Sequence, residues 1–205
     1  MKYYIFTDFE FNTFDKRYPE HYVPNEDGEY LKQEIIQLGL VITDTNFKVI
    51  KRLNYYVKPI FSKAIQWATA KTVPYNFQFL LDNGTEFVEV ITELTFELHL
   101  LSENLEDFYM CIFGTCDTPT FEKNCQFNNI LTPEFNWINI QSKIYHAVNI
   151  LTSTGKLSKF PSLARCCEVE QISTDTEKAH DALYDANLLY CLTKKLVTEG
   201  RVTLI

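Results

Sequence analysis

Two acidic residues alternate with phenylalanines near the start of the 205-residue chain. Asp8 and Glu10 flank Phe9, directly after the apolar residues 3–6. Side chains two apart on a strand share a face, so both carboxylates should point to one side and Phe9 and Phe11 to the other. Carboxylates on so apolar a strand repel each other and are costly to desolvate. A divalent cation would relieve both penalties.

Two further acids lie at the ends of expected elements. Asp117 follows the apolar run 109–113, and Asp185 lies in the helical pattern 182–197. Taken alone, each has an ordinary explanation, because Asp often caps a helix or sits on its solvated face. Mg²⁺ and Mn²⁺ prefer oxygen ligands, and a pair of ions needs about four carboxylates. Together with the acids of the first strand, these residues predict a site for two divalent cations.

A histidine lies five residues before the last of these acids. His180 stands at the expected start of the helix that carries Asp185. Histidine titrates near neutral pH and can take a proton from an attacking water. Without the acids, a helix-start histidine with no chemical role would be the better interpretation. The other histidines, His21, His99 and His146, have no such setting and are interpreted as structural.

The elements that must position these residues are indicated by hydrophobic periodicity. A meander of three strands is expected first, followed by a helix, a fourth strand, and further helices around a short edge strand. Residues 61–83 show no clear period and are only weakly helical. The expected strands are 3–7, 35–42, 47–57, 109–113 and 135–140, and the expected helices are 86–103, one starting after Asp117, one ending at Val148, 157–167 and 182–197. The pattern predicts one α/β domain over residues 1–205 with a mixed sheet.

Charge and cysteine usage limit the class of protein. Nineteen basic against 27 acidic side chains give a formal charge of −8, so contact with a polyanion would have to be local or metal-mediated. No run approaches the about 18 apolar residues of a membrane span, and no secretory signal precedes the acids. The six cysteines lack zinc-site spacing and are expected to be reduced thiols of a cytoplasmic protein. A zinc hydrolase is disfavoured because clustered histidine ligands are missing.

Three motifs resemble those of the DEDD superfamily of 3′–5′ exonucleases, in its histidine-containing DEDDh (DnaQ-like) branch. Asp8-Phe9-Glu10 is similar to the first motif, residues 114–117 to the second, and residues 180–185 to the third. Residues 34–39 resemble the second strand of the family. The related branch carries a tyrosine four residues before the last acid, where this chain has Asp181.

The resemblance implies a ribonuclease H-like α/β fold, with a five-stranded mixed sheet and helices on both faces. It implies that Asp8, Glu10, Asp117 and Asp185 hold two divalent cations, Mg²⁺ or Mn²⁺, with Asp8 between them. His180 would act as the base toward the attacking water. The product would be a 5′-mononucleotide released from a 3′ end.

The same resemblance assigns substrate contacts to the first motif. The backbone around Phe9 and Asn12 would face the terminal nucleotide. Phe11 would either stack on its base or pack in the core, and the sequence leaves both open. The single-stranded RNA or DNA 3′ end is the expected partner, with no membrane.

The first motif favours RNA over DNA. Proofreading-type relatives continue it with Thr-Gly, whereas this chain has Asn12-Thr13-Phe14, which is more similar to the ERI-1-like exoribonuclease branch. Three alternatives stay open: DNA-directed activity, a phosphodiesterase of the same fold acting on short oligonucleotides, and a non-catalytic nucleic-acid-binding module.

Overall fold

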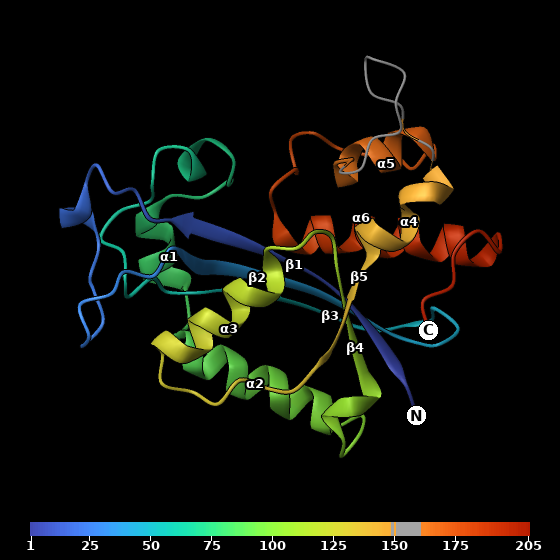
Figure 1. The fold of residues 1–205 in the computed structure, drawn as a ribbon, viewed down its shortest axis with the longest axis horizontal. Coiled ribbons are helices and arrows are strands. Elements are labelled where there is room, and N and C mark those ends of the chain that lie inside the picture. Colours follow the sequence, from blue (N-terminus) through green and yellow to red (C-terminus); the bar gives the residue numbers. More distant parts are fainter. Residues whose placement is uncertain (149, 151–160) are drawn as a thin grey trace.

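The central element of the fold is the first strand. The computed structural model describes residues 1–148, 150 and 161–205. Five strands form one sheet in the order β3-β2-β1-β4-β5, shown in Figure 1. Their bounds are β1 Tyr3–Thr13, β2 Gln33–Asp44, β3 Val49–Tyr56, β4 Phe108–Ile112 and β5 Asn136–Asn139. β1 is antiparallel to β2 and parallel to β4, so the sheet is mixed, as predicted.

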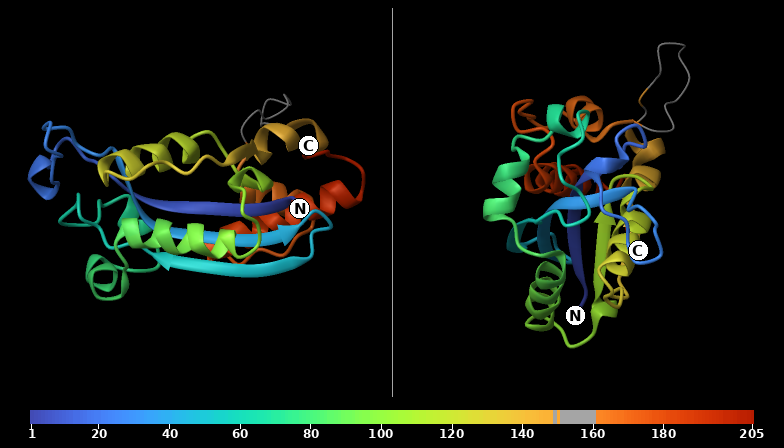
Figure 2. Two further views of the ribbon diagram at one scale, coloured as in Figure 1. Left: turned by 90° about the horizontal axis from the view of Figure 1, so that it is seen from below. Right: turned by 90° about the vertical axis from the view of Figure 1, so that its left-hand side faces the viewer.

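Helices cover both faces of this sheet (Figure 2). The helices are α1 Phe77–Asn83, α2 Phe87–His99, α3 Asp117–Phe127, α4 Ile140–Val148, α5 Leu163–Val169 and α6 Ala182–Thr198. Tyr4 and Phe6 of β1 join the core on the side of α4, α5 and α6. Tyr3 and Ile5 join the core on the side of α2 and α3. The alternation of β1 therefore divides the core into two layers.

β2 is buried on both faces, because it lies between β1 and β3 and beneath helices on each side. Residues 34–43 are all buried, including three polar side chains, Glu34, Gln37 and Thr43. Burying polar groups is costly unless they are hydrogen-bonded. Glu34 meets this requirement in part, because its Oε1 accepts from the backbone N–H groups of Ile60 and Phe61. Gln37 meets it through contacts with α6.

Three expected elements differ from the structure. β1 continues to Thr13, beyond the expected end at Thr7. Residues 61–83 form a short 3-10 turn, Thr69–Lys71, and then α1, because Pro74 disfavours helix in the residue before it. α3 begins at Asp117 itself, after Cys116, so this acid lies in the first turn rather than capping the helix from outside. Of the helix expected at 157–167, residues 157–160 lie outside the described part.

The described helices include none that is long and apolar enough to cross a bilayer. All six cysteines carry free thiols.

Candidate active site

The carboxylates of β1 lie on the side of α6. Asp8 pairs with Gly39 and Glu10 with Gln37 in the register of β1 and β2, and the register shifts just after Glu10. Phe9 points to the opposite face, where its ring stacks on Phe121 at 5.9 Å between centroids. The predicted division of acids and phenylalanines between the two faces is therefore confirmed.

The start of α6 is held on β2 by a buried glutamine. Gln37 is fully buried, and its Nε2 donates to Asn54 and to Oδ2 of Asp181 at 3.1 Å. Its Oε1 accepts from the backbone N–H of Ala182 at 3.2 Å. Asp181 in turn caps α6, because its Oδ1 accepts from the backbone N–H of Tyr184. One side chain thus fixes both the cap and the first turn of the helix.

A glycine lets the helix approach this strand. A Cβ at Gly39 would overlap backbone atoms of Ala182 and Leu183. Gly39 is the residue opposite Asp8, and Asp185 follows in the first turn of α6. Only glycine leaves room for the helix that carries Asp185 to lie so close to the strand beside Asp8.

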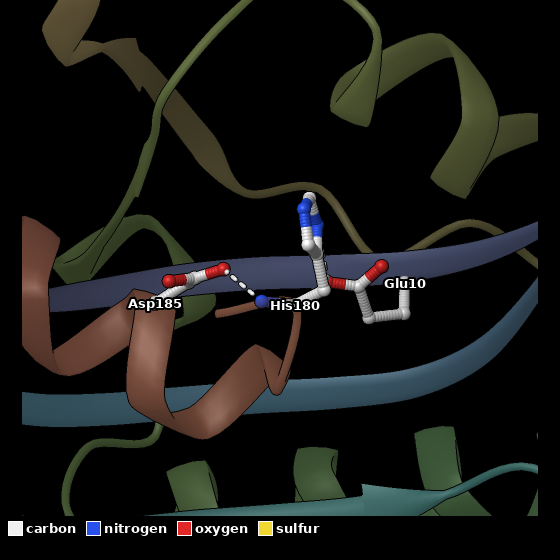
Figure 3. A group of neighbouring side chains, drawn as sticks. All are labelled: Glu10, His180 and Asp185. Carbon is white, nitrogen blue, oxygen red and sulfur yellow. Dashed lines mark hydrogen bonds and ion pairs between the residues drawn. The ribbon is translucent and has the colours of Figure 1, made fainter. Parts of the chain in front are cut away.

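His180 lies just before the cap of α6, in a left-handed conformation with φ of 64°. Its backbone N–H donates to Oδ2 of Asp185 at 3.1 Å. Its ring is 54% exposed, with Nδ1 3.9 Å from Oε1 of Glu10. Figure 3 shows the three side chains together, and their potential ligand atoms lie within 4.8 Å of one another. The ring is therefore both next to the acids and open to solvent.

Asp117 reaches the site from the turn between β4 and α3. Gly114 adopts a φ of 140° in this turn, a conformation that side chains rarely allow. Asp117 then begins α3 and is buried. Burial raises the pKa of its carboxyl to about 6.

The acids make one another difficult to ionise. Burial, and then the charges of Asp185, Asp181 and Asp117, raise the pKa of Glu10 to about 8. The pKa of Asp8 is raised well above its usual range, first by burial and then by Glu10 and its acidic neighbours. Burial likewise raises the pKa of Asp185. The four carboxylates of the motifs therefore share one electrostatic environment, although only Glu10, Asp185 and His180 fall within the 4.8 Å group.

This cluster fits divalent cations. Within residues 1–148, 150 and 161–205, no lysine or arginine forms an ion pair with Asp8, Glu10, Asp117 or Asp185. Four carboxylates without a basic partner form a set of hard oxygen donors whose mutual repulsion a cation would remove.

The expected substrate residues have different environments. Phe9 and Asn12 are buried, so only their backbone could face a nucleotide. Asn12 donates to the carbonyl of Ala64 at 2.9 Å and accepts from the backbone N–H of Gln66 at 2.7 Å. Phe11 is half-buried beside Phe9, with ring centroids 6.3 Å apart. Contact of this stretch with a terminal nucleotide stays a prediction.

Sequence reasoning missed the roles of Gln37 and Asp181. A signal was present, because Gln37 interrupts an otherwise apolar strand. Asp181 could have been recognised as a cap from its place before an apolar helical pattern. Their shared hydrogen bond joins residues 144 positions apart, which no local pattern reveals.

The sequence matches no protein-family model and no curated protein. Solved structures do match. The nuclease domain of 3′hExo, described as a DEDDh family member bound to rAMP, has a TM-score of 0.74 at 18% identity and covers 100% of this chain and 96% of that one. This chain has the DEDDh exonuclease fold.

Other solved structures share the DEDDh fold with this chain. Cell-death related nuclease 4 (CRN-4) has a TM-score of 0.77 at 21% identity, covering 100% of this chain and 67% of that one. E. coli Exonuclease I, in complex with a dT13 oligonucleotide, has a TM-score of 0.70 at 15% identity. That match covers 97% of this chain but 41% of Exonuclease I. The expected ribonuclease H-like α/β fold is confirmed.

Proposed function

We propose that this chain is a metal-dependent 3′–5′ exonuclease that releases 5′-mononucleotides from single-stranded nucleic acid. The observation that carries the proposal is the convergence of four acids and one histidine in a fold shared with 3′-exonucleases, with no lysine or arginine of the described residues paired to these acids. All five residues had been singled out from the sequence. We further propose that residues 1–205 form one such domain and act in the cytoplasm.

Asp8, Glu10, Asp117 and Asp185 would hold the cations, Mg²⁺ or Mn²⁺. When bound, two such ions neutralise the scissile phosphate, activate the attacking water and stabilise the leaving 3′ oxygen. Local neutralisation of this kind also explains how a chain of formal charge −8 could act on a polyanion.

His180 is the base in this proposal. Its ring is open to solvent, and its backbone is tied to Asp185, so the imidazole stays at the edge of the acid cluster. After taking a proton it would be stabilised by Glu10, whose Oε1 lies 3.9 Å from Nδ1, and could then pass the proton to bulk water. Gln37 and Asp181 position the turn that carries His180.

RNA is the favoured substrate, because the first motif lacks the Thr-Gly of proofreading enzymes. The solved structures of similar fold include both nucleic acids: a 3′-exonuclease with a histone mRNA stem-loop, and Exonuclease I with oligo-dT. The backbone of Phe9 to Asn12 would face the terminal nucleotide in either case.

The test uses 5′-labelled single-stranded RNA and DNA of one sequence, with Mg²⁺, with Mn²⁺ and with EDTA. We expect ladders that shorten from the 3′ end, faster on RNA, and no cleavage with EDTA. Asp8→Asn should lower the rate by about 10³-fold or more, as for loss of a group that stabilises transition-state charge. Asp27→Asn, on an exposed loop, is the matched control and should cleave normally.

Other outcomes would favour the alternatives. Binding of labelled strands without any cleavage, with the fold intact by circular dichroism, would favour the non-catalytic module. Cleavage restricted to strands of about two to five nucleotides would favour the short-oligonucleotide phosphodiesterase. Faster cleavage of DNA would overturn the RNA preference alone.

A further inference from the structure

Two aromatic side chains are exposed beyond the C-terminal end of β1. Trp67 is 67% exposed and Tyr18 50% exposed. Both line a hollow of about 630 Å³, with Arg17, His21 and Gln66 among its other lining residues. We call it the Trp67–Tyr18 hollow. Large aromatic side chains left in solvent, at the rim of a hollow, indicate a binding surface.

The hollow is built by two loops that pair with each other. Tyr22 and Ser62 form an antiparallel bridge between them. The backbone N–H of Lys63 donates to the carbonyl of His21 at 2.7 Å, and that of Val23 to the carbonyl of Phe61. In Figure 1 these loops lie side by side at the left, next to the arrowhead of β1. The aromatic rings are therefore carried on backbone that is fixed by hydrogen bonds.

Cations accompany both rings. Nζ of Lys71 lies 3.6 Å from the centroid of the Trp67 ring, and the guanidinium of Arg17 lies 5.8 Å from that of Tyr18. The ring of Tyr18 also stacks on His21, at 5.6 Å with 14° between the planes. The guanidinium of Arg17 is already paired with Asp15 at 2.6 Å, so Lys71 is the cation that suits a phosphate here. A flat ring beside such a cation suits a base with its phosphate, since the ring stacks on the base and the cation attracts the charge.

The charge of this region is opposite to that of the whole chain. Residues 58–81 carry three lysines and no acidic residue, in a chain of formal charge −8. Residues 14–22 of the facing loop add Lys16 and Arg17 against Asp15 and Glu20. The segment 58–81 is thus locally basic and complementary to a polyanion. The charged residues that line the hollow itself, Asp15 and Arg17, pair with each other at 2.6 Å.

The hollow is joined to the strand that carries the acids. Asn12 holds Ala64 and Gln66 through its buried side chain, and Oγ1 of Thr69 donates to the carbonyl of Phe11 at 3.1 Å. Asn12 lies two residues beyond Glu10, which is about 7 Å along a strand. A strand with its 3′ end at the acids could reach the hollow with the nucleotides just before that end.

We propose that the Trp67–Tyr18 hollow binds the single-stranded segment that precedes the 3′-terminal nucleotide. Bases stack on Trp67 and Tyr18, and Lys71 contacts a phosphate. This inference rests on the proposed exonuclease function and adds a second contact region to it. It predicts that longer strands bind more tightly than a mononucleotide does.

The first test measures stacking without turnover. The chain has two tryptophans, and Trp137 packs against Phe121 at 5.6 Å, so Trp137→Phe leaves Trp67 as the only emitter. In that variant with Asp8→Asn added to prevent cleavage, RNA of four or eight nucleotides should quench tryptophan emission, and a 5′-mononucleotide should not. Absence of quenching at concentrations where anisotropy of a labelled octanucleotide shows binding would overturn the inference.

The second test compares cleavage of a dinucleotide and an octanucleotide. Trp67→Ala should raise KM for the octanucleotide by about 10- to 100-fold, as expected for loss of one stacked base, with kcat and dinucleotide cleavage unchanged. Lys71→Ala should act in the same direction with a smaller effect. Phe96→Ala removes an equally exposed aromatic ring from α2, on the other face of the sheet, and should change nothing.

Failure of the inference about the hollow can be distinguished from failure of the proposed exonuclease function. An unchanged KM in Trp67→Ala, or equal losses on both substrates, would overturn the inference while leaving the exonuclease in place. If the wild type cleaves no strand, the proposed function fails. The quenching experiment uses no turnover, so it still decides whether the hollow binds single strands.

Discussion

At the scale of single residues, the site combines groups that are unfavourable together. Glu10 and Asp117 have raised pKa values, about 8 and about 6, because they are buried near other acids. His180 adopts a left-handed backbone conformation while its N–H is used by Asp185. Such features commonly mark functional positions, since they are retained despite their cost in stability.

His180→Ala tests the proposed base separately from the proposed cation ligands. We expect kcat to fall by about 10²- to 10⁴-fold, the usual contribution of a positioned general base. Binding of Mn²⁺, measured by calorimetry, should change little, because the four carboxylates remain. Loss of Mn²⁺ binding in this variant would instead identify His180 as a cation ligand.

At the scale of elements, the contact of α6 with β2 decides the geometry of the site. Gly39 allows the close approach, and Gln37 holds the first turn of the helix by hydrogen bonds to Asp181 and Ala182. Asp185 and His180 therefore depend for their positions on a strand that carries neither of them.

Gly39→Ala should disturb activity through the position of α6. The added methyl group would overlap backbone atoms, so the helix must move. A displacement of about 1 Å can lower a rate by about 10²-fold, and we expect a loss of that order. Gly28→Ala serves as a control, since Gly28 has a positive φ but open space around it. It should lower Tm without lowering kcat per folded molecule; equal kcat losses in both variants would contradict this role of Gly39.

Gln37→Met removes all four hydrogen bonds of the amide, to Asn54, Asp181, Tyr75 and Ala182, at nearly constant volume. Leaving their buried partners unsatisfied should cost about 1–3 kcal/mol in the free energy of unfolding, measured by urea denaturation. Gln37→Glu keeps an acceptor for Ala182 but places a further acid against Asp181, so its stability should be lower than that of Gln37→Met above neutral pH. The reverse order would show that the acceptor for Ala182 stabilises the fold by more than the added charge beside Asp181 destabilises it.

The helices and strands also show which parts of the fold can be predicted from the sequence. The alternation of Asp8 and Glu10 with Phe9 gave the correct faces of β1, because strand geometry is local. The succession of strands along the chain and the helical face of α6 were likewise readable from periodicity. Residues 61–83 were not, because their conformation depends on distant partners such as Asn12 and on the break at Pro74. The hydrogen bonds of Gln37 were hidden for the same reason.

At the scale of the whole molecule, charge is distributed unevenly. Acids gather where β1, α3 and α6 meet, whereas residues 58–81 are free of them. A phosphate backbone would thus be attracted to one end of the site and, without cations, repelled from the other. Cations at the acids would turn the whole path into a favourable one.

The pH dependence of stability should report this charge distribution. Asp8, Glu10, Asp117 and Asp185 have folded-state pKa values above their unfolded values. The folded protein therefore binds more protons, and this contribution, complete below about pH 4, is lost as pH rises through about 6 for Asp117 and about 8 for Glu10. In EDTA, we expect Tm to fall between about pH 6 and about pH 8.5.

Glu10→Gln and added Mn²⁺ are the controls for this pH dependence of Tm. Glu10→Gln in EDTA should show a flatter dependence, because the amide cannot ionise. Mn²⁺ should raise the Tm of the wild type, and more so at high pH, where the carboxylates have already lost their protons to solvent and can bind the cation. A Tm that rises with pH in EDTA would contradict the raised pKa values.

Asp8 lies near the start of the described chain and Asp185 lies near its end. Because α6 packs directly on Gly39, both parts of the chain contribute to one site. During translation, the acids of β1 leave the ribosome long before the helix that completes the set. If the site acts as proposed, a nascent chain that has not yet reached residue 180 would lack both the proposed base and one of the four carboxylates, and would cleave no nucleic acid. Premature termination before that residue would yield an inert product rather than an unregulated nuclease.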